Sequence, residues 1–290
     1  MIISIASGKG GTGKTTVATN LSRTIGKHVK ILDCDVEEPN SHLFLNPVIS
    51  DRKNVIAPIP EIDDEKCTYC KKCMDICRFG AIAVVGKKVL TFPELCHSCG
   101  GCKVVCPEDA ITDKARVLGI IETGTIKPDK NGDEVQFVHG LMDIGQVMAP
   151  PIIKQVITHA LPEDINIIDA PPGTSCPVIA AMKGADFILL VTEPTPFGLH
   201  DLTLAVETVK ILGIPHGLVI NRAGLGNDDV KIYAQKENIP ILMEIPFDKR
   251  IAEAYSKGEL IISCLPEYKE KFSGLYEKIK ELAAQRRQAQ

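Results

Sequence analysis

A glycine-rich segment near the start of the chain constrains the fold more than any other stretch. It reads GKGGTGKTT from Gly8 to Thr16, it follows the apolar run Ile2–Ala6, and the segment Lys14–Ile25 has the pattern of a helix. A strand, a glycine-rich turn and a helix in this order form the phosphate-binding loop G-x-x-x-x-G-K-[ST], whose backbone N–H groups surround a di- or triphosphate. The positive end of the helix then faces the anion. The sequence therefore predicts a nucleotide-binding α/β domain.

The loop pattern assigns roles to single residues. Lys14 is expected to reach the β- and γ-phosphates, and the Thr15 hydroxyl is expected to bind Mg²⁺. The residues expected to contact the di- or triphosphate are Gly8, Gly10, Gly11, Thr12, Gly13, Lys14, Thr15 and Thr16. A merely glycine-rich turn is the alternative, and the predicted strand and helix on either side argue against it.

Eight of the eleven cysteines form an internal repeat. Both copies have the spacing C-x₂-C-x₂-C-x₃-C, the second 29 residues after the first: Cys67, Cys70, Cys73 and Cys77, then Cys96, Cys99, Cys102 and Cys106. Disulfides are rare in a reducing cytosol, so metal or redox chemistry is the expected use. Zinc ribbons usually set two C-x₂-C pairs a dozen or more residues apart, whereas three thiolates within seven residues suit a 4Fe–4S cluster. We expect two such clusters, with two zinc sites as the alternative.

Composition narrows the possible partners and compartment. The net charge is −4 and the isoelectric point is about 6.0, so the chain lacks the excess of positive charge that favours nucleic-acid binding. Tryptophan is absent and aromatic residues make up 4%, which leaves few stacking platforms for single strands. Apolar runs such as Phe187–Val191 are far too short to span a membrane, and the N-terminus enters a strand without a charged leader. We expect a cytoplasmic protein with no nucleic-acid partner and no stable membrane insertion.

Strands and helices alternate along the rest of the chain, which predicts a doubly wound, mostly parallel sheet. Apolar runs end at Asp33 and at Asp169, where open α/β sheets place ligands. Helix capping is the alternative role for Asp33 and for Asp35. The stretch Ala115–Gly140 has two β-rich halves around KPDKNGD, which predicts a hairpin. The last helix, from Glu267, mixes lysine and glutamate on its polar face, so we expect it to pack on the domain rather than on lipid.

The position of Lys9, second in the loop, makes GKGGTGKT resemble the deviant Walker A motif of the MinD/ParA/Mrp and nitrogenase iron-protein superfamily, also grouped as CobQ/CobB/MinD/ParA. This resemblance implies an ATP hydrolase that forms a nucleotide-dependent homodimer, in which Lys9 reaches the partner subunit's phosphates. On the same match, Asp35 orients or deprotonates the attacking water, and Asp33 helps hold the hydration shell of Mg²⁺.

The phrase DAPPGT resembles the second switch segment of the same family. Asp169 would then hold Mg²⁺ through water, and Gly173 would let the backbone approach the γ-phosphate. Asn221, at a predicted strand end, matches the family's adenine-recognising asparagine. Pro246 and Phe247 match its adenine-flanking segment more weakly, and a structural turn is the favoured role for them.

The cysteine repeat resembles a bacterial-type two-cluster ferredoxin, in which the fourth cysteine of each run binds the other cluster. The resemblance implies one cluster on Cys67, Cys70, Cys73 and Cys106 and another on Cys96, Cys99, Cys102 and Cys77. We expect an ATPase domain at 1–60 and 113–290 with a small α+β ferredoxin insertion at 61–112. Cys176 follows Asp169 much as a bridging cluster ligand does in the nitrogenase iron protein. This chain shows no matching second cysteine there, so an ordinary cysteine is the favoured interpretation.

The combination predicts an ATPase that couples dimerisation and hydrolysis to electron transfer toward a partner protein. The alternatives are an Mrp-like carrier of iron–sulfur or metal clusters and a redox-sensing positioning ATPase. The sequence names neither the partner nor the direction of coupling.

Overall fold

The computed structural model describes residues 1–128 and 134–289, and within them nine strands form one sheet in the order β11-β10-β9-β1-β8-β2-β7-β6-β3. These strands are β1 (Ile2–Ala6), β2 (Val29–Asp33), β3 (Val48–Ile62), β6 (Ile111–Ile126), β7 (Val135–Met142), β8 (Ile165–Asp169), β9 (Phe187–Thr192), β10 (His216–Ala223) and β11 (Ile241–Pro246). From β11 to β7 every neighbouring pair is parallel, whereas β6 is antiparallel to both β7 and β3. The predicted α/β fold with a large, mostly parallel sheet is confirmed.

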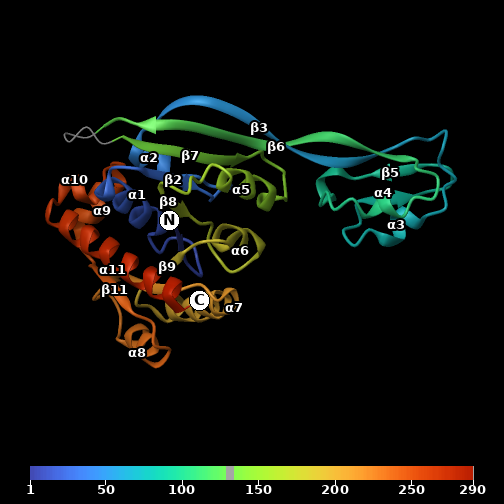
Figure 1. Ribbon diagram of the computed structural model, residues 1–290. Helices are drawn as coiled ribbons and strands as arrows, with labels where there is room; N and C mark the ends of the chain where they lie inside the picture. Colours follow the sequence, from blue (N-terminus) through green and yellow to red (C-terminus); the bar gives the residue numbers. More distant parts are fainter. Residues whose placement is uncertain (129–133, 290) are drawn as a thin grey trace.

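Helices cover both faces of this sheet (Figure 1). The helices are α1 (Lys14–Ile25), α2 (Ser41–Leu45), α5 (Ala149–Ile157), α6 (Cys176–Met182), α7 (Pro196–Leu212), α8 (Asp229–Lys236), α9 (Lys249–Ser256), α10 (Ile261–Cys264) and α11 (Glu267–Ala289). One apolar core joins the sheet to α5, α6, α7 and α8, and a second joins it to α1, α10 and α11. Because strand side chains alternate between faces, Leu32 belongs to the first core and Ile31 to the second.

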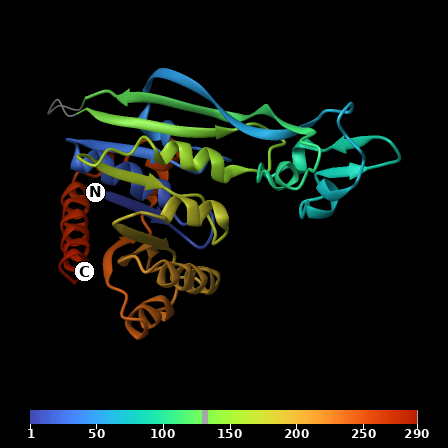
Figure 2. The ribbon, with the colours of Figure 1, turned by 45° about the vertical axis from the view of Figure 1, so that its right-hand side comes forward.

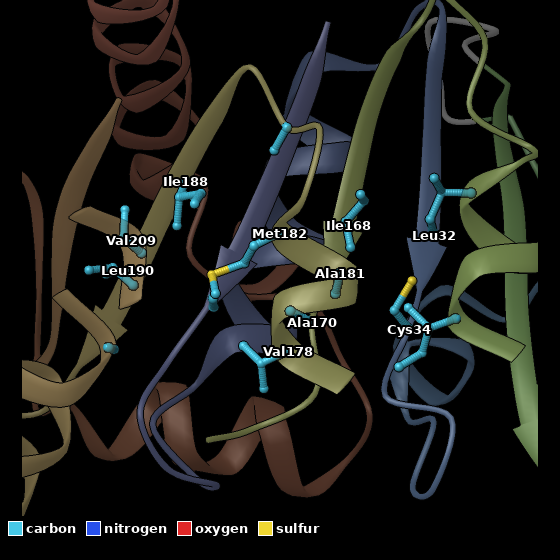
Figure 3. Packing of buried hydrophobic residues seen from close by; sticks show 14 of the residues in the cluster. Leu32, Cys34, Ile168, Ala170, Val178, Ala181, Met182, Ile188, Leu190 and Val209 are labelled. Carbon is cyan, nitrogen blue, oxygen red and sulfur yellow. The ribbon is translucent and has the colours of Figure 1, made fainter. Parts of the chain in front are cut away.

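Figure 3 shows part of the first core, where Val178, Ala181 and Met182 of α6 lie over the strands. Cys34, just after β2, is fully buried in the same cluster. On the other face, α11 buries Tyr268, Phe272, Leu275 and Ile279, so its apolar stripe packs on the domain as expected. In the part of the chain that the structure describes, no helix is both long and apolar enough to cross a membrane.

The two long strands β3 and β6 extend beyond the sheet as a ribbon (Figures 1 and 2). The pairing of β6 with β7 starts at Gly119 opposite Met142, the last residue of β7. β6 residues before Gly119 pair only with β3, down to Ile111 opposite Ile62. The free part of the ribbon therefore projects from the edge at which the parallel strands end. About seven residue pairs give it a length of roughly 24 Å at 3.4 Å per residue.

The ribbon carries a separate cysteine-rich unit, residues 63–110 (Figure 2). It contains α3 (Lys72–Ile76), β4 (Ile82–Val84), β5 (Val89–Thr91), the short 3₁₀ helix η1 (Pro93–Leu95) and α4 (Gly101–Val104). The sequence repeat is also a backbone repeat. Positive φ occurs at Tyr69, Lys71 and Gly80, and again at Ser98, Gly100 and Asp109, each 29 residues later.

Local hydrogen bonds and strand pairing set the bounds of further elements. α7 begins at Pro196, directly after Thr195, whose hydroxyl caps the helix by accepting a hydrogen bond from the Gly198 N–H. The predicted hairpin is formed by β6 and β7, from Gly119 opposite Met142 to Ile126 opposite Val135. Its turn residues 129–133 lie outside the described part of the chain.

Candidate functional site

The glycine-rich loop runs from the end of β1 into α1, as the motif predicts. At two positions of this loop, neighbouring atoms leave no room for a side chain, so glycine is required. A Cβ at Gly8 would lie 2.0 Å from the carbonyl oxygen of Asp201, and one at Gly13 would lie 2.3 Å from Asn221 Nδ2. Gly13 also has φ 100°, which other residues rarely adopt. The loop is therefore packed directly against α7 and the end of β10.

A cleft of about 330 Å³ opens beside this loop. The predicted residues that line it are Gly10, Gly11, Gly13, Lys14, Thr15, Thr16, Asp35 and Asn221. The volume is at the lower end of the range for small-molecule pockets. Its opposite wall comes from Phe247 at the end of β11 and from Ile251 and Tyr255 of α9. Pro246 and Phe247, for which a structural turn was favoured, thus lie on the wall of the cleft.

Lys14 lies at the base of the cleft among acidic groups. Lys14 is only 6% exposed. This burial lowers the pKa of its ammonium group, although the negative charges of Asp169, Asp35 and Asp33 act in the opposite direction. A buried ammonium without bulk water gains most from an added anion. Phosphate oxygens in the cleft would supply that anion.

The two predicted Mg²⁺ carboxylates are neighbours across the sheet. Asp33 ends β2 and Asp169 ends β8, and the register pairs them directly. Asp33 accepts backbone N–H bonds from Asp35 at 3.1 Å and Ser41 at 3.0 Å, and the Ser41 hydroxyl donates to Asp169 Oδ2 at 3.2 Å. Ser41 was not predicted as part of the site, since no motif marks it.

Burial dominates the electrostatics of these carboxylates. Burial raises the pKa of Asp33, and burial together with the charge of Asp33 raises the pKa of Asp169. Burial also raises the pKa of Asp35 to about 6. Asp169 Oδ1 is fully buried and has no hydrogen-bond partner among the described residues. Because hard oxygen ligands are what Mg²⁺ prefers, the residues present fit this ion.

Lys9 does not point into the cleft of its own chain. Its Nζ lies 2.5 Å from Glu193 Oε1, and Arg222 Nη1 lies 2.9 Å from Glu193 Oε2. Burial would raise the pKa of Glu193, but the hydrogen bond from Lys9 and the two positive charges hold that pKa below its usual value. Glu193 follows β9 and has no motif that signals it, so sequence reasoning missed it.

Three predicted residues, Asn221, Thr12 and Gly173, lie in or against the loop, and of these only Asn221 also lines the cleft. The side-chain amide of Asn221 donates to the Thr12 carbonyl oxygen at 2.8 Å, so Asn221 both lines the cleft and holds the loop. The Thr12 hydroxyl is buried and has no partner among the described residues. Gly173, with φ 99°, donates its N–H to the Ser7 carbonyl oxygen at 3.0 Å, which ties the segment after β8 to the loop.

The eight repeat cysteines line two cavities of the cysteine-rich unit. The first cavity is lined by Cys67, Cys70, Cys73 and Cys106, and the second by Cys77, Cys96, Cys99 and Cys102. Each cavity therefore receives three thiols from one repeat and the fourth from the other. The second cavity also touches Pro58, Ile59 and Pro60 of β3, so it faces the ribbon.

Backbone N–H groups approach several of these sulfurs. Tyr69 N lies 3.4 Å from Cys67 Sγ, Ser98 N lies 3.4 Å from Cys96 Sγ at the equivalent place, and Ala110 N lies 3.4 Å from Cys106 Sγ. Such N–H···S bonds stabilise thiolate ligands of iron–sulfur clusters. The rings of Phe79 and His97 stack with centroids 3.6 Å apart beside the second cavity.

Burial raises the pKa of the thiols of Cys73 and Cys102, the third cysteines of the two runs. Among the described residues, no group of three or more His, Cys, Asp or Glu side chains converges closely enough for a single metal ion. The thiols instead surround cavities, and the donor set of four thiols with N–H···S bonds fits a cluster. Cys34 is buried, whereas Cys176 and Cys264 are exposed, and neither of the exposed two lines a cavity described above.

Comparisons with known proteins agree with this fold and loop. Residues 3–261 match the model of the CobQ/CobB/MinD/ParA nucleotide binding domain. Two uncharacterized proteins of Methanocaldococcus jannaschii are 34% and 33% identical, covering 89% and 97% of this chain and 90% and 97% of their own. An iron-sulfur cluster carrier protein of Pyrococcus horikoshii is 24% identical over 90% of this chain and 78% of its own length.

A similar solved structure is the septum site-determining protein MinD of Pyrococcus horikoshii with Mg-ADP. It has a TM-score of 0.58 and 25% identity, over 97% of this chain and 96% of that one. The MinD-like fold and the family match, together with the loop, the cleft and the buried carboxylates, lead to one assignment. This chain belongs to the CobQ/CobB/MinD/ParA nucleotide-binding family.

Proposed function

We propose that this protein is an ATPase that binds two 4Fe–4S clusters and couples ATP-dependent dimerisation and hydrolysis to electron transfer with a partner protein. The observation that carries the proposal is the pair of cavities, each lined by four thiols in the crossed arrangement of two-cluster ferredoxins. These cavities lie on a ribbon that leaves the same sheet edge as the nucleotide loop.

The proposed hydrolysis is an in-line attack of water on the γ-phosphate. Lys14 would neutralise charge on the phosphates, Thr15, Asp169 and Asp33 would hold Mg²⁺, which would supply further positive charge, and Asp35 would orient the water. Lys9 of a second copy would approach the same phosphates, as an arginine finger does. For that contact Lys9 must leave Glu193, which holds it in the single chain.

The first cluster would be held by Cys67, Cys70, Cys73 and Cys106, and the second by Cys77, Cys96, Cys99 and Cys102. When bound, each supplies one-electron chemistry at a potential set by burial and by hydrogen bonds to its sulfurs. The chain's own contribution is to orient the thiols through the positive-φ turns and to place the second cavity against the ribbon.

Two other functions have support from the comparisons. Similarity to the Pyrococcus iron-sulfur cluster carrier favours a carrier of clusters, and the MinD-like fold favours a positioning ATPase. The crossed thiol sets argue against a carrier, because releasing either cluster requires both repeats to open.

The deciding experiment is an anaerobic redox titration of the purified protein, followed by EPR, with and without Mg-ATP. A nucleotide-dependent shift of midpoint potential or line shape supports coupled electron transfer. Identical curves favour the carrier or positioning function. A preparation that contains zinc and shows no cluster signal contradicts the cluster assignment itself.

A further inference from the structure

The first cysteine cavity opens beside two lysines that the second repeat lacks. Lys71 and Lys72 are exposed and line the first cavity. At the equivalent positions, 29 residues later, Gly100 and Gly101 line the second cavity. The internal repeat therefore provides its own comparison, in which the same backbone carries lysine at one cavity and glycine at the other.

Lys71 occupies a backbone conformation that favours glycine. Its φ is 66°, close to the 72° of Gly100. A non-glycine residue in the left-handed region costs on the order of 1 kcal/mol relative to glycine. Glycine would thus be the less strained choice at position 71, as it is in the other repeat. Tyr69 and Ser98 also have positive φ, so it is the contrast between lysine and glycine at equivalent positions that points to a function of the lysine side chain.

The two cavities also differ in net charge. Among residues 1–128 and 134–289, neither Lys71 nor Lys72 has an ion-pair partner, and Glu108 is the acidic residue that shares their cavity. At the second cavity, Lys103 is paired with Asp113 at 2.6 Å, and both line that cavity. The mouth of the first cavity is therefore positive, and the mouth of the second is balanced.

We infer that the mouth of the first cavity, marked by Lys71 and Lys72, is the docking site for an acidic redox protein of the ferredoxin type. A local positive charge next to the reacting centre steers an acidic partner and fixes its orientation. The inference rests on the proposed function, because the cavity must hold a cluster for docking to transfer an electron. One electron passes from the reduced partner to the cluster in the first cavity. The partner is oxidised by one electron, the cluster is reduced by one electron, and no covalent bond is made or broken.

The experiment compares three variants of the whole protein. The first is Lys71→Gly with Lys72→Gly, which installs the residues of the other repeat and relieves the strain at position 71. The second adds Gly100→Lys and Gly101→Lys, which keeps the net charge and moves the lysines to the second cavity. A Cβ at Gly100 meets no atom within 4 Å, and one at Gly101 meets Cys99 Sγ at 3.7 Å, so both lysines have room. The lysine at position 100 takes on the same backbone strain that Lys71 has, because the φ values are 72° and 66°. The control is Lys87→Gln with Lys88→Gln, which removes two exposed lysines of the β4–β5 turn.

Two readouts are measured against ionic strength with a purified acidic plant-type ferredoxin as the probe. One is its association rate with the immobilised protein, and the other is the rate at which reduced ferredoxin bleaches the cluster absorbance. We expect the glycine pair to slow both about tenfold at low salt and to flatten the salt dependence, while the control pair stays within twofold. The lysine swap is expected to restore association but not the rate of electron transfer.

Equal effects of the glycine pair and the control pair on both readouts would overturn the inference. It would also be overturned if the glycine pair lost binding to phosphatidylserine vesicles but kept full association with ferredoxin, since the lysines would then serve a lipid surface. Reduction by dithionite separates this result from failure of the proposed function. If one of these two results is found while all variants show a 4Fe–4S signal and dithionite reduces them equally, only the docking inference fails; if no variant shows a cluster, the proposed function fails.

Discussion

Lys9 is held by an acid of its own chain, 2.5 Å from Glu193, although the family resemblance directs this lysine to a second subunit. We predict that Lys9→Ala lowers the ATP hydrolysis rate by about 10³-fold or more, the range known for residues that supply transition-state charge in trans. The same variant is expected to lose ATP-dependent dimerisation. Steady-state hydrolysis and sedimentation velocity with ATP measure the two effects.

The matched control for Lys9 is Glu193→Gln. This change removes the acid that binds Lys9 and Arg222 but leaves both cations in place. Dimerisation with ATP should then be retained or strengthened, because Lys9 no longer has to break an ion pair. An unchanged ATP-bound dimer in Lys9→Ala would remove the cross-subunit role of the lysine.

The buried carboxylates predict a dependence of stability on pH. Burial raises the pKa of Asp33 and Asp35 to about 6 and that of Asp169 to about 7, from a usual value of 3.8. Between pH 4 and 7 the folded, nucleotide-free protein therefore binds more protons than the unfolded chain. Its free energy of unfolding should fall as pH rises through this window, because burial opposes the charged form of these carboxylates.

Urea denaturation at pH 5.5 and pH 8 tests this dependence, with Asp169→Asn as the comparison. The variant should stabilise the nucleotide-free protein at pH 8 by more than about 1 kcal/mol and have a smaller effect at pH 5.5, since a one-unit pKa difference corresponds to about 1.4 kcal/mol. Mg-ADP should stabilise the unmodified protein more at pH 8 than at pH 5.5, because the ion needs deprotonated ligands. The same effect of Asp169→Asn at both pH values would contradict the pKa argument.

At the scale of elements, charged side chains tie β3 to the sheet. The register places Arg52, Glu122 and His139 side by side on β3, β6 and β7, and His139 is in turn opposite Asp33. Glu122 accepts from Arg52 Nε at 2.7 Å and lies 2.7 Å from His139 Nε2. Burial would raise the pKa of Glu122, but these hydrogen bonds hold it below its usual value. Glu122 thus links Arg52 of β3 to β7, the strand that pairs with β2 and places His139 opposite Asp33.

We predict that Glu122→Ala lowers the free energy of unfolding by about 3 kcal/mol. The change leaves His139, whose side chain is 6% exposed, without its hydrogen-bond partner, whereas Arg52 is 67% exposed and can be hydrated instead. The lower end of the range for breaking a buried pair therefore applies. Glu61→Ala is the control on the same two strands, since its pair with Lys114 is exposed and should contribute less than 1 kcal/mol. Equal midpoints of urea unfolding for the two variants would show that Glu122 has no anchoring role.

The elements show what the sequence could and could not predict. Strands with two buried faces, such as β9, were predicted because their apolar residues run without interruption. β3 was not predicted, since most of its side chains are exposed and Pro58 and Pro60 lie within it. Prolines are tolerated there because β3 is the edge strand, where an N–H has no further strand to bond.

The residues of the candidate site also differ in whether the sequence alone could reveal them. The loop, the carboxylates and the cysteines were found because each belongs to a local pattern of fixed spacing. Glu193, Ser41 and Tyr255 have no such pattern, and only the folded chain brings them to the site. The crossed thiol sets came from resemblance to ferredoxins, and in the structure each set lines one cavity.

At the scale of the whole molecule, the nine-stranded sheet with its covering helices, here called the body, and the cysteine-rich unit differ in their source of stability. The body has two large apolar cores. The buried apolar residues of the unit at 63–110 are few, and none is aromatic: Ala81, Ile82, Val84 and Ala110. A unit of this size with so little core needs another source of stability, and bound metal commonly supplies it in small domains.

Removal of iron should therefore unfold the cysteine-rich unit and leave the body folded. We predict that an anaerobic chelator increases amide hydrogen exchange across 63–110, while β1, β8 and β9 keep their protection and the protein still binds Mg-ADP. Cys106→Ala should have the same effect on exchange without a chelator, because it takes a thiol from the first cavity. Cys264→Ala, at an exposed cysteine far along the chain, should have none.

Unchanged exchange in 63–110 after complete loss of iron would mean that the turns and short helices of the unit fold without a cluster. Loss of protection in β1 and β8 as well would show that the ribbon transmits the state of the unit to the nucleotide site.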